Sequence, residues 1–376
     1  MKLFKHDKLR VVILSMTKYG GAVHYASQLA NALSQICDVT VVAPVETRRY
    51  FHRTGFIACP TLASHRVPSL SAYRQVYQMI KNLSPDIIHD PTGPQYCWTT
   101  PLNFLLSHKF PLVVTIHVIR PQTGMSLPRR WLHSLIVRIN NSISNMVVVT
   151  GQHLVKDIVA KGATPAKVKV IPHGCISLNR QVDYEDENPI PTVLFFGALR
   201  FNKGIDRLIN IANLVASSIP NVKFLVAGSL QSLKQLDETG KRRILSALET
   251  MRNSPLFHLD VRYIPDEDVP KLFRYAWVVV LPYRDASQSG IIGLAYNFSR
   301  PVVATNVGAL SEIVDNGVTG FVVDPESDEG IAEALVKILQ DENLRLQMGR
   351  AGRKKANGEL SWNAIAAQTV AAYRSI

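Results

Sequence analysis

The sequence contains no uninterrupted apolar run of the roughly 18 residues that a membrane-spanning helix needs. The apolar part of the N-terminal stretch "MKLFKHDKLRVVILSM" is short and precedes no cleavage-site pattern, so we expect a first strand there and no signal peptide. The cysteines, Cys37, Cys59, Cys97 and Cys175, lie far apart with no CxxC pair, which argues against a zinc site and suits a reducing cytosol. Because neither GxGxxG nor GxxxxGK[ST] occurs, a dinucleotide fingerprint and a P-loop are not supported.

Acidic residues are scarce in the first half of the chain. Residues 1–180 hold 21 Lys and Arg against 6 Asp and Glu, a net charge of +15, whereas the remaining residues hold 21 against 23, a net charge of −2. This asymmetry favours an anionic partner, such as a membrane surface or an anionic glycan, over the simpler explanation of solubility. A nucleic acid is not favoured, because the basic residues are dispersed and lack interleaved aromatic residues.

A chain of 376 residues is longer than one hydrophobic core usually serves, so we expect two domains. Short apolar strands alternate with helix-like patterns, pause at the acidic, proline-containing segment 177–191, and then restart. This alternation predicts an α/β fold made of two doubly wound parallel sheets, with ligands at the carboxyl ends of the strands. We place the domains at 1–180 and 181–359, and expect a last helix at 360–376 that Ser361 could cap. The expected strands are 10–16, 38–44, 86–91, 112–117, 146–151 and 168–174, and then 192–197, 222–229, 261–265, 276–283, 300–306 and 319–324.

Two segments of the second half predict an anion site. In "VLFFGALRFNKGIDRLINIA", Arg200 and Lys203 follow a strand end, where two cations can hold a diphosphate; the alternative is a pair of solvated loop cations. In "DASQSGIIGLAYNFSRPVVAT", Gln288, Ser289 and Gly290 open a helix whose first N–H groups suit an anion, yet no acid follows Asp285.

A third segment, "RYIPDEDVPKLFRYA", places Ile264 at a strand end, followed by a run of acids. Asp266 and Asp268 match a DxD metal pattern, but capping of the next helix is the better explanation of their position.

Candidate sites in the first half are less distinctive. Gly20 and Gly21 precede a helix, where they allow either close approach to a ligand or a plain tight turn. His117 follows a strand and faces the expected cleft; His24, His89 and Asp90 are weaker signals of the same kind. The segment 126–142 pairs Arg129, Arg130 and Arg138 with Trp131, Leu132, Leu135 and Ile136, which describes either a basic amphipathic helix on anionic lipid or an ordinary helix with its apolar stripe in the core.

In order along nearly the whole chain, the motifs "YGGAVHYASQLANAL", "TIH", "VIPHG", "FGALRFNKGID", "VAGS", "YIPDEDVPKLF", "LPY", "RPVVATNVGALSEIVDNGVTGFVVDP" and "SWNAIAAQTVAAYR" resemble glycosyltransferase family 4. Its members are retaining enzymes that use nucleotide sugars and have the GT-B fold, two Rossmann-like domains facing a central cleft. The resemblance implies that Arg200 and Lys203 bind the donor diphosphate and that the Gly20–Gly21 loop closes over it. It also places Ile264 by the nucleobase and His117 by the reacting sugar, and packs the tail helix back on the first domain.

The chain departs from the family pattern at three positions. Members commonly carry a glutamate at each end of a nine-residue segment, where this sequence has Ala286 and Leu294, and an aspartate where it has Val118. Gln288, Ser289 and Gly290 instead offer an amide, a hydroxyl and backbone N–H groups. The segment resembles that of a polysaccharide-related subset of the family, which suggests a variant site.

The resemblance and the composition together predict a metal-independent, retaining hexosyltransferase. It would move a sugar from a nucleotide diphosphate sugar, used as a substrate and with no further cofactor, to a lipid-linked or polysaccharide acceptor for cell-surface glycan or exopolysaccharide. We expect a cytoplasmic protein, peripheral at the inner face of the plasma membrane; the oligomeric state is open. The alternatives are another GT-B reaction, such as epimerisation or phosphorolysis, and a non-catalytic sugar-nucleotide-binding or scaffold protein.

Overall fold

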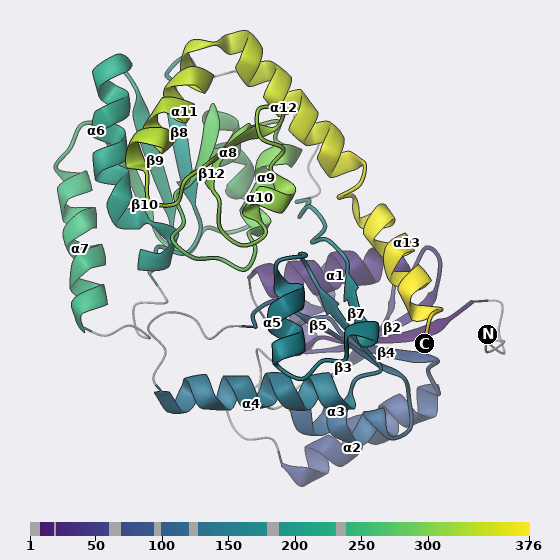
Figure 1. The fold of residues 1–376 in the computed structure, drawn as a ribbon. Coiled ribbons are helices and arrows are strands. Elements are labelled where there is room, and N and C mark those ends of the chain that lie inside the picture. Colours follow the sequence, from purple (N-terminus) through teal and green to yellow (C-terminus); the bar gives the residue numbers. More distant parts are fainter. Residues whose placement is uncertain are drawn as a thin grey trace. The chain divides into compact units, whose positions relative to one another are not determined.

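The computed structural model describes residues 8–18, 20–59, 69–93, 99–119, 127–178, 188–230 and 238–376. The chain forms two compact units: the first ends at Gly174 and resumes at Leu360–Ile376, and the second runs from Cys175 to Glu359. Each unit is an α/β domain built on one parallel sheet (Figure 1). The boundary predicted at residue 180 lies outside the described residues.

The first unit contains a seven-stranded parallel sheet in the order β3-β2-β1-β4-β5-β6-β7. Its strands are β1 (Arg10–Leu14), β2 (Asp38–Ala43), β3 (Gly55–Ala58), β4 (Ile87–Asp90), β5 (Leu112–Ile116), β6 (Met146–Val149) and β7 (Val168–Val170). Strand β3 lies at an edge, and its partly exposed "GFIA" lacks the long apolar run on which the sequence prediction relied, which is why that prediction missed it. The strand order reverses between β1 and β4, the place where ligands bind in doubly wound sheets.

Helices cover both faces of this sheet. One face is covered by α2 (Leu70–Leu83), α3 (Thr99–Ser107), α4 (Leu127–Ile143) and α5 (Leu154–Ala160). The other is covered by α1 (Gly21–Leu33) and α13 (Trp362–Tyr373), and short 3₁₀ turns occupy Val45–Tyr50 and Pro165–Lys167. Buried Val, Ile and Leu side chains alternate between the two cores along each central strand, as a sheet buried on both faces requires.

The second unit has a six-stranded parallel sheet in the order β10-β9-β8-β11-β12-β13. Its strands are β8 (Thr192–Phe196), β9 (Lys223–Gly228), β10 (Phe257–Val261), β11 (Val278–Leu281), β12 (Val302–Thr305) and β13 (Gly320–Val323). Its helices are α6 (Leu208–Ser218), α7 (Glu238–Arg252), α8 (Val269–Tyr275), α9 (Gly290–Asn297), α10 (Leu310–Ile313), α11 (Asp328–Gln340) and α12 (Glu342–Asn357), with 3₁₀ turns η4 (Phe201–Lys203) and η5 (Ile205–Arg207).

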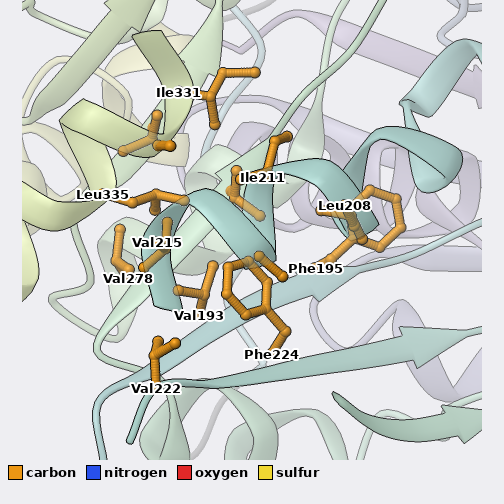
Figure 2. Close-up of a cluster of buried hydrophobic side chains, with 14 of the residues drawn as sticks. Val193, Phe195, Leu208, Ile211, Val215, Val222, Phe224, Val278, Ile331 and Leu335 are labelled. Carbon is orange, nitrogen blue, oxygen red and sulfur yellow. The ribbon is translucent and has the colours of Figure 1, made fainter. Parts of the chain in front are cut away.

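The core of this unit forms where α6, α7 and α11 pack on one face of the sheet. Figure 2 shows Val193 and Phe195 of β8 beside Ile211 of α6 and Leu335 of α11, all fully or almost fully buried. Phe196, the next residue along β8, points to the opposite face and contacts the ring of Phe273 of α8. This packing holds the carboxyl end of β8 rigidly in place.

One predicted strand is wrong. The sequence placed a strand at 261–265, whereas β10 ends at Val261. The strand is an edge strand with only partly buried side chains, "FHLDV", so its apolar pattern is weak and the apolar residues just beyond it were taken for the strand.

The C-terminal helix α13 belongs to the first unit, and buried groups hold it there. The Ser361 side chain caps it by accepting a hydrogen bond from the Ala364 N–H at 3.3 Å, as the sequence predicted. The ring of His89, fully buried, bridges Tyr373 of α13 and Thr115 of β5: its Nδ1 lies 2.6 Å from the Tyr373 hydroxyl and its Nε2 lies 2.8 Å from the Thr115 hydroxyl. His89 therefore joins the helix to the sheet and has no exposure to a ligand.

Acidification is expected to destabilise the first unit through two buried histidines. Burial lowers the pKa of His89 to about 3 and that of His173 to about 4, from 6.5. At a pH between each lowered pKa and 6.5, the unfolded chain binds a proton at that histidine and the folded chain does not. The free energy of unfolding therefore decreases as the pH falls below 6.5. The loss approaches about 1.4 kcal/mol per pH unit for each histidine. Thermal melts between pH 7.5 and 4.5 should show a shallower decline for His89→Gln, and an equal decline would contradict the assignment.

Candidate functional site

In the second unit the sequence-predicted residues gather at the point where the strand order reverses. Strands β8 and β11 are neighbours there, and the chain leaves them in opposite directions, so their carboxyl ends open a crevice. Arg200 and Lys203 follow β8, while Gln288, Ser289 and Gly290 follow β11 and open α9. Two segments about 90 residues apart in sequence thus flank one strand pair.

Main-chain hydrogen bonds tie these two segments together. The carbonyl of Asn202 accepts from the N–H groups of Arg284 at 2.9 Å and Asp285 at 3.3 Å. The Asn202 amide donates back to the Asp285 carbonyl at 3.2 Å. Arg284 also forms a two-pronged ion pair with Asp206, at 2.6 and 2.9 Å, and its guanidinium lies over the Phe201 ring. The loop that carries Arg200 and Lys203 is therefore fixed in advance of any ligand.

Both candidate cations are partly desolvated. The pKa of Lys203 is lowered to about 7, chiefly by burial and in addition by the neighbouring charge of Arg200, while Asp285 opposes the shift. Burial also lowers the pKa of Arg200. The Lys203 ammonium lies 3.7 Å from the centre of the Tyr283 ring, so an aromatic face takes the position of a counter-ion. An anion with two negative charges would relieve this arrangement.

The start of α9 offers donors and lacks a competing acid. Ser289 is its N-cap, but its side chain makes no capping hydrogen bond, and the first turn contains no acidic residue. The Ser289 hydroxyl lies 3.3 Å from the Tyr283 hydroxyl. The Gln288 Oε1 atom is buried and has no hydrogen-bond partner among the described residues. The first backbone N–H groups of this eight-residue helix therefore lie beside polar side chains that can hydrogen-bond to a ligand.

Two of the three positions that depart from the family pattern, Ala286 and Leu294, belong to the segment around the start of α9. Leu294 is buried within α9, and Ala286 is partly exposed in the loop before it. The Ala286 carbonyl packs against Gly308, where an added Cβ would overlap its oxygen.

Ile264 follows the edge strand β10. It is buried beyond the end of β10, two strands away from β8, and so does not follow its strand directly as predicted. The capping explanation for the acids after it is wrong for Asp268. Asp268 is the N-cap of α8 but makes no capping hydrogen bond, because its backbone is helical (φ −89°, ψ −23°); its carboxylate instead accepts from Arg262 at 2.9 Å.

In the first unit, Gly20 and Gly21 lie at the equivalent reversal point, after β1. Gly20 has φ +77° and is the N-cap of α1, so a tight turn requires glycine there. A Cβ added at either glycine would meet no atom of the described residues within 4 Å. The turn is therefore both necessary for the backbone and open to a ligand.

His117 follows β5 and is buried among aromatic rings. Its Nε2 donates to the Pro91 carbonyl at 2.8 Å, because a carbonyl oxygen can only accept. The Nδ1 atom is thereby left as an acceptor, and it has no partner among the described residues. Burial lowers the pKa of His117, so the ring is a neutral acceptor with a fixed tautomer.

The sequence did not assign a role to Tyr25 or to His173. The Tyr25 ring lies 4.6 Å from the His117 ring and the His173 ring lies 6.1 Å from it, and both contacts restrict His117. Tyr283 in the second unit was also missed. The motifs "YGGAVHY", "VIPHG" and "LPY" contain these residues, but only the fold places each beside a predicted site residue.

The weaker candidates are structural or peripheral. The Asp90 carboxylate is buried and accepts from Thr92, Gly93 and Asn103, which fixes the loop after β4. His24 contacts the Tyr50 ring at 5.3 Å. In the part of the chain that the structure describes, no three His, Cys, Asp or Glu side chains gather as a metal site would need.

Two doubly wound units in one chain, with cations and a helix start at the strand-order reversal of the second, fit the GT-B fold of glycosyltransferases. Two family models match the chain: the "Glycosyltransferase Family 4" model over residues 19–176 and the "Glycosyl transferases group 1" model over residues 181–355. The chain belongs to this family of glycosyltransferases.

Curated relatives are glycosyltransferases of several kinds. The chain is 28% identical to an uncharacterized glycosyltransferase of Methanocaldococcus jannaschii over 61% of this chain and 60% of that protein. It is 30% identical to the capsular polysaccharide biosynthesis glycosyltransferase CapM of Staphylococcus aureus over 44% of this chain and 41% of that one. It is 26% identical to the alpha-maltose-1-phosphate synthase of Mycolicibacterium smegmatis over 95% of this chain and 96% of that protein. The match thus spans well under two thirds of the first two relatives and nearly all of the third.

Solved structures share the fold across the chain. Sucrose-phosphate synthase from Thermosynechococcus elongatus matches with a TM-score of 0.73 and 20% identity, covering 98% of this chain and 99% of that one. HepE of Anabaena, solved in complex with UDP-glucose, matches with a TM-score of 0.75 and 15% identity, covering 98% of this chain and 100% of that one.

Proposed function

We propose that this glycosyltransferase takes its sugar from a nucleoside diphosphate sugar and transfers it with retention of the anomeric configuration. The observation that carries the proposal is the crevice of the second unit, where Arg200, Lys203 and the start of α9 flank the β8–β11 strand pair. The UDP-glucose complex of the structural relative HepE supports a uridine nucleotide as the first donor to test.

Arg200, Lys203 and the N–H groups of α9 would stabilise the negative charge that develops on the leaving diphosphate. Protein cations supply that charge, so the proposed reaction uses no metal ion and no further cofactor. His117 Nδ1 would accept a hydrogen bond from a hydroxyl of the reacting sugar. In the retaining step, the bond from the anomeric carbon to the diphosphate breaks, the acceptor oxygen bonds on the same face, and the leaving oxygen takes the acceptor proton.

The acceptor in this proposal is a lipid-linked or growing polysaccharide hydroxyl at the cytoplasmic face of the plasma membrane. The name of the relative CapM, which refers to capsular polysaccharide biosynthesis, supports a role in cell-surface glycan synthesis. The excess of basic residues over residues 1–180 supports an acceptor that carries phosphate.

The test is a donor screen on the full chain. Each nucleotide sugar of a panel is mixed with the protein, and thermal shift and slow release of nucleoside diphosphate are measured. We expect one donor to raise the melting temperature and to be slowly hydrolysed. Binding of nucleotides without release from any donor would instead favour a non-catalytic sugar-nucleotide-binding protein, and a changed sugar at constant nucleotide would indicate epimerisation.

A further inference from the structure

The surface of α4 conflicts with the usual pattern of a helix packed on a sheet. Such a helix buries its apolar stripe and exposes its polar one. Here Val137 is buried in the core on the sheet and Ile136 is also buried, yet four large apolar side chains of the helix are exposed: Leu127 (77%), Trp131 (68%), Leu132 (45%) and Leu135 (37%). Leu127, Trp131 and Leu135 are spaced by four residues and so form one continuous stripe along α4.

The neighbouring helix also exposes large apolar side chains. Helices α3 and α4 pack side by side, and the Asn103 amide of α3 donates to Asn140 of α4 at 3.1 Å. Helix α3 exposes Phe104 (48%) and Leu105 (46%). Helix α7 of the second unit is the useful contrast: it buries Ile244, Leu248 and Met251, and Leu245 alone among its large apolar side chains is exposed. We name the six exposed residues of α3 and α4 the α3–α4 apolar face.

The positive charge of the surrounding sequence indicates an anionic partner for this face. Between Asp90 and Asp157 the sequence contains no Asp or Glu, while it contains Lys109, Arg120, Arg129, Arg130, Arg138 and Lys156. Arg130 and Arg138 are exposed on α4 itself. Tryptophan and leucine on a helix flanked by arginines are the residues that lie at the headgroup level of an anionic bilayer, with the arginines on the lipid phosphates.

We propose that the α3–α4 apolar face docks on the surface of an anionic lipid bilayer. Of the two interpretations that the sequence left open for this helix, the exposed stripe favours the lipid one, because Trp131 and Leu135, which an ordinary apolar stripe would bury, are exposed. No helix among the described residues is long and apolar enough to cross a bilayer, so attachment through this face is interfacial. The role of this docking rests on the proposed function: it would bring the enzyme to a lipid-linked acceptor.

Vesicle flotation of the full chain, with no sugar substrate present, tests the docking separately from the transfer reaction. The vesicles contain phosphatidylcholine alone or an equimolar mixture with phosphatidylglycerol, each at low and at high salt. We expect binding to the anionic vesicles, weaker binding at high salt, and a blue shift of tryptophan fluorescence. Trp131→Glu with Leu135→Glu should lower the partition coefficient by about tenfold or more, and Trp131→Phe should keep binding but lose most of the blue shift.

The matched control is Leu245→Glu in α7, which places the same charge at an exposed leucine of the other unit and should leave flotation unchanged. Because all the substituted side chains are exposed, melting temperatures should stay near that of the parent chain, and this is measured for each variant.

Failure to float with anionic vesicles would overturn the proposal. Flotation of the double variant equal to that of the parent chain would also overturn it. A dimer in solution that Trp131→Glu dissociates would overturn it too, and would assign the face to a second copy of the chain. A donor screen that fails while flotation succeeds would refute the transfer reaction alone.

Discussion

Lys203→Met is expected to lower sugar transfer by about a thousandfold while making the ligand-free protein more stable. The folded state holds this ammonium largely out of water, and burial is the main cause of its pKa of about 7. Between that value and 10.5 the unfolded chain binds the proton that the folded chain lacks, so stability rises with pH over this window, and the full penalty applies at and below pH 7. Methionine fills the same volume without the charge, so the melting temperature should rise by a few degrees at pH 6.5.

The same substitution separates function from folding. Lys271→Met, at an exposed lysine of α8, is the matched control and should change neither turnover nor melting temperature. Arg200→Ala should also abolish transfer, without the gain in stability that removal of the more deeply buried cation brings. The affinity of the parent chain for inorganic pyrophosphate should fall as the pH rises above about 7, and that of Lys203→Met should not. Near-normal turnover of Lys203→Met with any donor would rule out its assignment to the diphosphate.

The fold was largely predictable from the sequence because apolar strands and helix-like patterns alternate so regularly. Strand β8 and the start of α13 were located to within a residue or two, since a buried β-branched run and a capping serine are strong local signals. Strands β3 and β10 were missed or misplaced, because edge strands are half exposed and carry little pattern. Edge position is a property of the whole sheet, and it cannot be derived from a window of residues.

The candidate site was predictable only in part, for a similar reason. Arg200, Lys203 and Ser289 have recognisable types at strand ends and helix starts. Tyr283 has no such signal: its importance comes from the 3.7 Å between its ring and the Lys203 ammonium, which joins residues 80 positions apart. The charge state of Lys203 depends on the same long-range packing, and so does the tautomer of His117, which a carbonyl 26 residues away determines.

Gly204→Ala is expected to destabilise the second unit by about 3 kcal/mol or more and to remove pyrophosphate binding. Gly204 has φ +73°, which side chains rarely adopt, and an added Cβ would overlap the carbonyl oxygen of Pro282. That carbonyl cannot move away easily, since it accepts a hydrogen bond from the buried Arg207 at 3.2 Å, and Arg207 is itself paired with Asp328 at 2.6 Å. The strain therefore falls on the loop that carries Lys203.

Gly317→Ala provides the matched control, because it has nearly the same backbone but a different environment. Gly317 has φ +79°, and nothing lies within 4 Å of an added Cβ, so only the backbone strain of about 1 kcal/mol applies. Urea unfolding of the two variants, followed by circular dichroism, gives the difference in free energy directly. Equal losses would mean that the Pro282 carbonyl does not confine the loop. A large loss for Gly204→Ala alone would show that the position of Lys203 depends on close main-chain packing between the segments after β8 and β11, and so on the strand pair that creates the crevice.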